Sequence, residues 1–412
     1  MDVSSLRVDG ARLRGSLERM AQIGATPAGG VQRLALSDED ERARDLLVSW
    51  FEEIALEVTV DEMGSIFGRR HGRDDDEPPV MMGSHVDSQP RGGRFDGILG
   101  VMGALEVLRT LAEHKLQTRR PLVAVDWTNE EGCRFAPAMM ASGVWSGRLE
   151  RDWVWGRTDL AGKSVLGELE RIGYRGGDPC AGRPFAAYFE LHIEQGPLLD
   201  REGVTIGVPK GILAIHWYDV HVDGRANQVG PTPMVGRADA LVAAAEMIVR
   251  VRELPALLGG DLVATVGEIH NEPNSRNIIP GHVHFTVDVR SWDDALALRA
   301  WEELRGALEA TAAAHGCAIR LEETWRVQHV EFAAHLVRRV EARAQALGYS
   351  TLPMVSGAGH DASYMALTGP TAMIFVPSID GRSHVEVEET TWEDCEAGAN
   401  VLLQCVAQTA EE

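Results

Sequence analysis

Three short apolar segments of the sequence each end in acidic or imidazole side chains. They read PVMMGSHVDS, PLVAVDWTNEEG and FAAYFELHIEQG, and each has the length and composition of a buried strand. Between the first two, FDGILGVMGALEVLRTLAEH is apolar nearly all round, which predicts a buried helix. This order of strand, helix and strand predicts an α/β domain whose site lies at the strand ends of an open sheet.

A second pattern occupies the middle of the chain, where residues 212–327 alternate polar and apolar side chains over several strands. Helical periodicity interrupts these strands near 238–252 and 293–315. We therefore expect an inserted α+β domain at 212–327. The first domain is then discontinuous and consists of 1–211 and 328–412. Further helices are predicted at 10–21, 37–56 and 392–409.

The charge of the chain excludes two classes of partner. Its 412 residues contain 40 Lys and Arg against 62 Asp and Glu, a formal charge of −22. Nucleic acids and anionic membrane surfaces require a cationic surface, so neither is expected as a partner. The five cysteines form no C-x-x-C pair, and the N-terminus lacks the apolar region of a signal peptide. Since no apolar run reaches the roughly 18–20 residues of a membrane span either, we expect a cytoplasmic protein.

The polar residues at the strand ends are of the types that bind transition metals. They are His85, Asp87, Asp96, Glu130, Glu131, His192, Glu194, Gln195 and, near the C-terminus, His384. Imidazole combined with carboxylate suits zinc, manganese, cobalt or nickel. Two such ions about 3.5–4 Å apart can polarise a carbonyl group and activate a shared water molecule. One carboxylate must bridge the ions, and Asp96, in a tight glycine-flanked turn, is placed to do so.

A further carboxylate, not bound to metal, must carry a proton from the water to the leaving nitrogen. Glu130 and Glu131 can divide metal binding and proton transfer between them, because adjacent side chains at a strand end point in different directions. Asp87 can orient the imidazole of His85. Glu194 is expected to be a hydrogen-bond partner rather than a ligand.

Together these motifs resemble those of a family of metal-dependent amidohydrolases. The motifs are GSHVDSQPRGGRFDG, TNEEGCRF, LHIEQGP, ANQVGPTPM, NSRNIIPG, SGAGHDA and IFVPSIDGRSH. The chain is similar to the N-carbamoyl-L-amino-acid hydrolases, beta-ureidopropionases and allantoate amidohydrolases, within the clan of co-catalytic zinc exopeptidases and aminoacylases. The resemblance implies a zinc-exopeptidase-like catalytic domain with a mixed sheet. It also implies that the inserted domain acts as a lid and forms a homodimer.

The resemblance implies a role for individual residues as well. The implied ligands of two divalent metal ions per subunit, with zinc before manganese, cobalt or nickel, are His85, Asp96, Glu131, His192 and His384, and Asp96 is shared. Glu130 would act as general base and then as acid, and Asp87 would orient His85. A guanidinium is the natural receptor for a substrate carboxylate. The implied substrate contacts are Gln195, Asn277, Arg290 and the backbone of Gly359, supported by His360 and Asp361.

One motif departs from the family pattern. Where this chain has Gln228, the family has a histidine that reaches the active site of the partner subunit and helps to stabilise the developing oxyanion. The amide of Gln228 can donate a hydrogen bond but carries no charge. We expect hydrolysis of a linear amide or carbamoyl C–N bond in a small carboxylate-bearing substrate, an N-carbamoyl or related N-substituted amino acid. Two alternatives stay open: an N-acyl-amino-acid amidase that removes another acyl group, and a metal-binding homologue of impaired activity.

Overall fold

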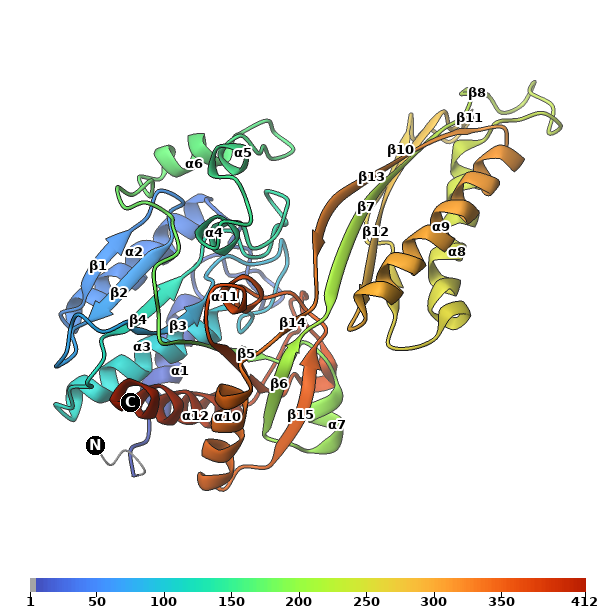
Figure 1. Ribbon diagram of the computed structural model, residues 1–412. Coiled ribbons are helices and arrows are strands. Elements are labelled where there is room, and N and C mark those ends of the chain that lie inside the picture. Colours follow the sequence, from blue (N-terminus) through green and yellow to red (C-terminus); the bar gives the residue numbers. More distant parts are fainter. Residues whose placement is uncertain (1–4) are drawn as a thin grey trace. The chain divides into compact units, whose positions relative to one another are not determined.

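The structure is a computed structural model that describes residues 5–412 and divides into two compact units. Unit 1 consists of the residues up to Gly211 together with Glu331–Glu412, and unit 2 consists of Ile212–Val330. Each unit has its own sheet and its own helices (Figure 1).

Unit 1 contains a nine-stranded mixed sheet in the order β1-β2-β4-β3-β5-β16-β6-β14, with β15 beside β6. The strands are β1 (Glu57–Val60), β2 (Ile66–Arg70), β3 (Val80–Ser84), β4 (Leu122–Asp126), β5 (Ala187–Ile193), β6 (Ile206–Ile212), β14 (Val330–Glu331), β15 (Thr351–Ser356) and β16 (Thr371–Val376). β4, β3, β5 and β16 are parallel, whereas β2 and β6 run antiparallel to their neighbours in this set. The α/β class with a mixed sheet, predicted from the sequence, is confirmed.

The helices of unit 1 cover this sheet and its ends. They are α1 (Gly10–Met20), α2 (Asp38–Glu53), α3 (Ile98–Glu113), α4 (Met140–Trp145), α5 (Arg151–Trp155), α6 (Val165–Arg171), α7 (Leu198–Glu202), α10 (Ala334–Ala346), α11 (Ala362–Ala366), α12 (Trp392–Glu411) and the 3-10 turn η1 (Ile379–Gly381). α3 is buried nearly all round because it contacts β3 and β5 as well as α1 and α12. α10 was not anticipated, although Leu336, Val340 and Ala344 recur every four residues on its buried face.

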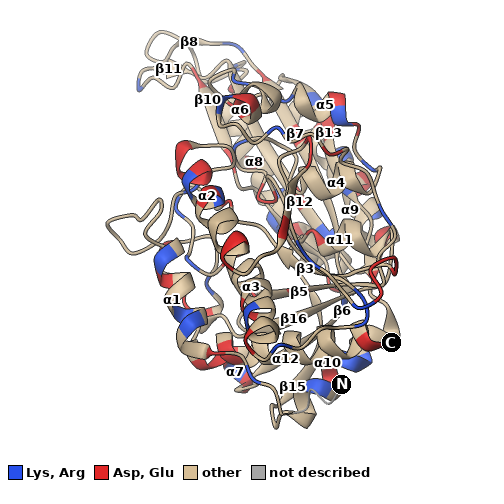
Figure 2. Cartoon of the chain, turned by 90° about the vertical axis from the view of Figure 1, so that its left-hand side faces the viewer, with Lys and Arg blue, Asp and Glu red and all other residues tan. Residues whose placement is uncertain are grey.

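The surfaces of α1 and α2 carry charges of both signs (Figure 2). Arg14 and Glu18 on α1 form an ion pair of 2.8 Å one helical turn apart, and Arg42 pairs with Glu39 on α2. Among residues 5–412, no helix combines the length and the apolar composition that crossing a membrane requires.

Unit 2 contains a sheet in the order β10-β12-β7-β13 with β9 beside β12, and a separate pair formed by β8 and β11. Its elements are β7 (Ala214–Asp223), β8 (Asn227–Gln228), α8 (Ala240–Leu258), β9 (Val263–Thr265), β10 (Ile269–Glu272), β11 (Ile278–Ile279), β12 (His282–Ser291), α9 (Asp294–Ala314) and β13 (Ala318–Val327). Both helices cover one face of the sheet (Figure 1), and strict alternation of burial along β12 reflects this one-sided core. The segment LVATVGEIH forms the two short strands β9 and β10 on either side of Gly267.

Candidate metal centre

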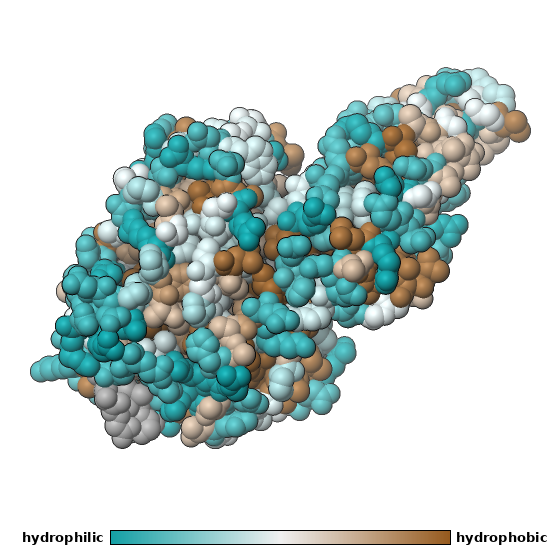
Figure 3. All heavy atoms as spheres, in the orientation of Figure 1, coloured by the Kyte–Doolittle hydropathy of each residue, from teal (hydrophilic) through white to brown (hydrophobic). Residues whose placement is uncertain are grey.

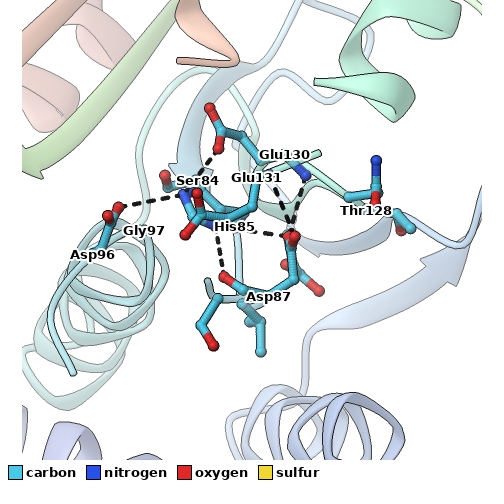
Figure 4. Close-up of polar contacts among 12 residues, drawn as sticks. Ser84, His85, Asp87, Asp96, Gly97, Thr128, Glu130 and Glu131 are labelled. Carbon is cyan, nitrogen blue, oxygen red and sulfur yellow. Dashed lines mark hydrogen bonds and ion pairs between the residues drawn. The ribbon is translucent and has the colours of Figure 1, made fainter. Parts of the chain in front are cut away.

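The carboxyl ends of β4, β3, β5 and β16 lie next to one another at one edge of the unit 1 sheet. His85 directly follows β3, Glu130 and Glu131 follow β4 after a short turn, and His192 is the penultimate residue of β5. His384 follows β16 and η1. Parallel strands end at the same edge of a sheet, so residues far apart in the sequence meet here. Figure 4 shows the part of this cluster that follows β3 and β4.

Asp96 lies between two groups of possible metal ligands. It forms one group with His85 and His192 and another with Glu131 and His384, and in each group the ligand atoms lie within 4.8 Å of one another. Its Oδ1 is 3.1 Å from His192 Nε2 and 3.7 Å from His85 Nε2, and its Oδ2 is 3.2 Å from His384 Nε2. One carboxylate oxygen therefore faces each group, which is the arrangement of a bridging carboxylate.

The chemistry of these donors fits two divalent transition-metal ions. Each group combines imidazole nitrogen with carboxylate oxygen, the ligand types that zinc and its neighbours prefer. Glu131 Oε2 accepts a hydrogen bond of 2.7 Å from Gln89 Nε2, whereas Glu131 Oε1 is buried without a hydrogen-bond partner among the described residues. Leaving a carboxylate oxygen buried and unpaired is costly. A bound cation would satisfy it.

Protonation of the imidazoles depends on Asp96. Burial opposes ionisation of Asp96, but hydrogen bonds from His192 and His384 outweigh it and hold its pKa well below the usual value. Burial likewise opposes a charge on the two imidazoles, yet Asp96 raises the pKa of His192 to about 9, and Glu131 with Asp96 raises that of His384 to about 10. Burial lowers the pKa of His85 to about 4. Because imidazole binds metals through an unprotonated nitrogen, a metal ion would replace the protons on His192 and His384.

Glu130 lies beside the first ligand group without belonging to either group. Its side chain is 8% exposed, and its Oε2 is 3.4 Å from His85 Nε2. Burial, followed by the negative charges of Asp361 and Glu131, raises the pKa of Glu130 well above its usual value. A buried carboxyl group with a raised pKa is suited to accept a proton and return it.

Asp87 supports the site through two different groups. Its backbone carbonyl accepts a hydrogen bond of 2.9 Å from His85 Nδ1, while its carboxylate Oδ1 is 3.7 Å from that nitrogen. The carboxylate instead accepts the backbone N–H groups of Glu130 and Glu131, at 3.2 and 3.3 Å (Figure 4). The hydrogen bond to His85 Nδ1 is thus made by the backbone of Asp87, and its side chain lies within 3.7 Å of that nitrogen and holds the glutamate pair.

Gln195 lies at the edge of the second ligand group. Its Nε2 donates a hydrogen bond of 2.8 Å to Asp96 Oδ2 and is 3.1 Å from His384 Nε2. The preceding Glu194 points elsewhere, since its carboxylate accepts the backbone N–H groups of Leu198 and Leu199 at the start of α7. Glu194 is therefore a hydrogen-bond partner, as the sequence predicts.

The loop between β15 and α11 brings further polar residues to this edge. His360 is buried, with its ring centroid 4.4 Å from that of His192. Asp361 is also buried and accepts a hydrogen bond from Ser142 Oγ. Burial, and then the charge of Glu190, raises the pKa of Asp361 well above its usual value. Gly359 is half-buried in the same loop.

A buried arginine that the sequence did not reveal holds the segment after β3. Arg33 is 2% exposed, and its Nε donates a hydrogen bond of 2.7 Å to the carbonyl of Val86, the residue after His85. The backbone N–H of Arg33 donates to Ser88 Oγ, and its carbonyl accepts the N–H of Ser88. Arg33 therefore fixes both the backbone and the charge balance beside His85.

A second buried arginine holds the segment after β4. Arg44 on α2 is fully buried and donates from Nε to Asp40 Oδ2 at 2.9 Å and from Nη1 to the carbonyl of Gly64 at 2.7 Å. Its Nη2 donates to Thr128 Oγ1 at 3.2 Å. Thr128 lies in the turn that leads from β4 to Glu130. Arg44 thus connects α2 with the segment that carries both glutamates.

The three predicted substrate contacts in unit 2 fall into two places. Gln228 on β8 pairs with Ile278 on β11, and the N–H of Val229 donates to the carbonyl of Asn277. Arg290 lies on β12, where its guanidinium pairs with Asp288 at 2.6 Å.

The length of β12 separates these places. Gln228 lies on β8 and Asn277 directly precedes β11, and the β8–β11 pair adjoins the His282 end of β12 (Figure 1). Arg290 lies eight residues further along β12, opposite Ile215 on β7. At about 3.4 Å per residue, the separation along the strand is roughly 27 Å. Unit 2 therefore brings Gln228 and Asn277 together and holds Arg290 apart from them.

Comparison with known proteins identifies relatives over nearly the whole chain. The profile described as Peptidase family M20/M25/M40 matches residues 81–408. The chain is 44% identical over 411 residues to an N-carbamoyl-L-amino-acid amidohydrolase of Rhizobium meliloti, covering 98% of this chain and 97% of that protein. It is 31% identical over 400 residues to the allantoate amidohydrolase of Bacillus subtilis, covering 96% of each. An amidase of the hydantoinase/carbamoylase family from Burkholderia vietnamiensis superposes with a TM-score of 0.97 at 49% identity, covering 99% of both chains.

Replacing Arg44 by Met should destabilise the protein strongly. The substitution leaves Asp40 buried without its cation, and loss of one partner of a buried ion pair costs about 3–5 kcal/mol. Urea denaturation of the variant measures this loss. Arg42→Met on the same helix is the control, since Arg42 is exposed and forms a solvent-exposed ion pair with Glu39, so its effect should stay below about 1 kcal/mol. Equal unfolding midpoints for the two variants would contradict the role of Arg44.

Proposed function

The chain belongs to Peptidase family M20/M25/M40, in the branch of the N-carbamoyl-L-amino-acid and allantoate amidohydrolases, and on this premise we propose its reaction. The proposed reaction is metal-dependent hydrolysis of a linear amide or carbamoyl C–N bond in an N-carbamoyl or related N-substituted amino acid. The family and the hydrolase class that the sequence predicts are confirmed. The observation that carries the proposal is Asp96, with one oxygen toward each of two ligand groups and Glu130 beside them.

Two divalent metal ions per subunit are part of the proposal. His85 and His192 would hold one, Glu131 and His384 the other, and Asp96 both. Zinc suits these donors best, with manganese, cobalt and nickel as alternatives. When bound, such ions polarise a carbonyl oxygen and lower the pKa of water.

Glu130 is proposed as the residue that moves the proton. A carboxylate at this position accepts a proton from the attacking water and donates it to the leaving nitrogen, whose departure breaks the C–N bond. The carboxylate of Asp87 keeps Glu130 in place by accepting its backbone N–H. The raised pKa of Glu130 supports this role, because the proton is then held strongly enough to be stored between the two transfers.

The substrate contacts are proposed from the family resemblance and the geometry of each unit. Gln195 and the backbone of Gly359 would contact the amide or ureido group, and Arg290 the substrate carboxylate. The guanidinium of Arg290 already donates hydrogen bonds to the carboxylate of Asp288. A substrate carboxylate would therefore displace Asp288 or bind beside it.

Gln228 and Asn277 are proposed to act in the active site of a partner subunit. They lie at the opposite end of β12 from Arg290, so the residues of one unit 2 would serve two different sites in a homodimer. The loop after β8 supports an interface, because Met234 and Val235 are 76% and 93% exposed. Figure 3 shows brown side chains among white and teal ones at the β8 end of unit 2. We propose a homodimer formed through the inserted unit.

Removal of a different acyl group is a second candidate, and Gln228 favours it. A neutral amide cannot supply the positive charge of the family histidine, so either the acyl group or the stabilisation of the transition state differs. An impaired homologue finds less support, because the five ligand residues and Glu130 are all present. All five cysteines are free, which supports a reducing compartment such as the cytoplasm as the proposed location.

Chelation should abolish the activity, and added zinc, manganese, cobalt or nickel should restore it. The substrates for this measurement are carbamoyl, formyl, acetyl and aromatic acyl derivatives of the same amino acids, and release of the free amino acid is followed. Carbamoyl amino acids should be hydrolysed, while matched compounds with a carboxamide in place of the carboxylate should not. Activity that is indifferent to chelation would refute a metal-dependent reaction, and turnover of acyl derivatives alone would select the second candidate.

Glu130→Gln and Glu131→Gln should have different consequences. The first should lower kcat by about 10²–10⁴-fold with the metal content unchanged, because only proton transfer is lost. The second should lose one metal ion per subunit, since it removes a ligand. Metal analysis after gel filtration, together with kcat, separates the two. If Glu130→Gln loses the metal and Glu131→Gln retains it, the proposed roles are exchanged.

Mixed dimers should reveal whether Gln228 serves the partner's site. Glu130→Gln and Gln228→Ala should each be nearly inactive alone. In a mixed dimer, the chain with Gln228→Ala still has Glu130 and receives the native Gln228 from its partner, so one of the two sites is complete. Co-expression should therefore restore part of the activity. Co-expressed Glu130→Gln and Glu131→Gln are the control. Both substitutions lie in unit 1, so every active site of a mixed dimer still carries one defective glutamate. Activity of the first mixture no higher than that of its parents would reject exchange between subunits.

A further inference from the structure

Glu388 is a buried carboxylate with no role in the reaction described above. It lies four residues after His384 and is 2% exposed. Its Oε1 accepts the backbone N–H groups of Phe95 at 3.1 Å and Asp96 at 3.0 Å, and its Oε2 accepts a hydrogen bond of 2.8 Å from Ser383 Oγ. One carboxylate thus joins the turn that carries Asp96 to the segment that carries His384.

The turn approaches Glu388 so closely that Gly93 has no room for a side chain. A Cβ on Gly93 would lie 1.9 Å from Glu388 Oε1, far below any real contact distance. Glycine at this position lets the backbone of the turn reach the carboxylate.

His384 has a backbone conformation that its neighbours must maintain. Its φ of 59° lies in the left-handed region, which few residues other than glycine adopt. Such a conformation persists where the surrounding structure imposes it. Ser383, the preceding residue, contacts Glu388 Oε2 and lies 3.2 Å from Asp96 Oδ2. Glu388 and Asp96 therefore restrain the chain directly next to this strained histidine.

We propose that Glu388 is a positioning residue that sets the separation of Asp96 and His384 and thereby the affinity of the second metal ion. The inference rests on the proposed dinuclear site. Glu388 holds the backbone of Asp96 directly and that of His384 through Ser383, and Asp96 Oδ2 is 3.2 Å from His384 Nε2. Loss of either connection changes this distance. Groups that orient metal ligands in this way typically contribute 10–100-fold to metal affinity.

The neighbouring pair of Arg94 and Glu389 provides a matched control. It joins the same two segments, with Arg94 Nη2 at 2.9 and 2.8 Å from the two carboxylate oxygens of Glu389. The Glu389 side chain is 42% exposed, and among residues 5–412 no hydrogen bond of this pair reaches a proposed ligand residue. Its removal should leave the metal affinity unchanged.

The experiment compares Glu388→Ala, Glu388→Gln and Glu389→Ala with the wild-type protein. Co²⁺ is titrated in competition with a chelator of known affinity, the visible absorption of the Co²⁺-loaded proteins is recorded, and thermal unfolding reports on folding. Glu388→Ala should bind one of two Co²⁺ ions 10–100-fold more weakly and show an altered spectrum. Glu388→Gln should retain most of the affinity, because its carbonyl oxygen still accepts the N–H groups. Glu389→Ala should match the wild type.

If Glu388→Ala folds, binds both Co²⁺ ions with wild-type affinity and shows an unchanged spectrum, the positioning role of Glu388 is overturned. The proposed dinuclear site would not be affected by that result. If Glu388→Ala does not fold, Gly93→Ala tests the same contact, because the added Cβ displaces the carboxylate. It should weaken the same ion, and wild-type affinity in Gly93→Ala would again overturn the inference. A wild-type protein that binds no Co²⁺ would instead overturn the dinuclear site and the proposed function with it.

Discussion

Buried negative charge at the carboxyl ends of the parallel strands is the constraint on which the rest of unit 1 depends. The carboxylates buried around this edge include Asp40, Asp87, Asp96, Asp126, Glu130 and Glu131. Removing such groups from water is expensive unless each finds a cation or several hydrogen bonds. Arg33 and Arg44 supply positive charge behind the strand ends, where Arg33 interacts with Asp40, Asp87 and Asp126. On the other side Asp96 faces imidazoles together with the side chains of Gln195 and Ser383. The proposed metal ions would add positive charge there.

The backbone determines which nitrogen each central imidazole presents. His85 Nδ1 is hydrogen-bonded to the backbone carbonyl of Asp87, and His192 Nδ1 is hydrogen-bonded to the carbonyl of Ile193, both at 2.9 Å. In both rings Nε2 is then directed at Asp96 Oδ1. A carbonyl that accepts from Nδ1 selects the tautomer whose Nε2 has a free lone pair, which is the form that binds metal. Strand ends therefore orient the candidate ligands as well as bring them together.

How far the sequence predicts this site depends on the range of the interactions involved. His85, Glu130 and His192 could be found because each follows an apolar run, and that pattern is local. Arg44 could not, although it shares one helical stripe with Leu47 and Phe51 on the buried face of α2. An arginine in an apolar stripe becomes interpretable only when its partners are known, and Thr128 is distant in the chain. Glu388 was overlooked for the same reason, since its hydrogen bonds reach across the sequence to Phe95 and Asp96.

The sequence by itself determined the α/β class, the chemical types of the candidate metal ligands and the family, because periodicity and motifs depend on neighbouring residues. Only the tertiary structure decided which atoms meet. It placed Asp96 between two groups of candidate ligands and made the backbone carbonyl of Asp87 the hydrogen-bond partner of His85. It also separated Gln228 from Arg290 by the length of β12. These outcomes depend on strand order, register and the balance of buried charge. Such properties arise from contacts between distant segments, which no local pattern of residues encodes.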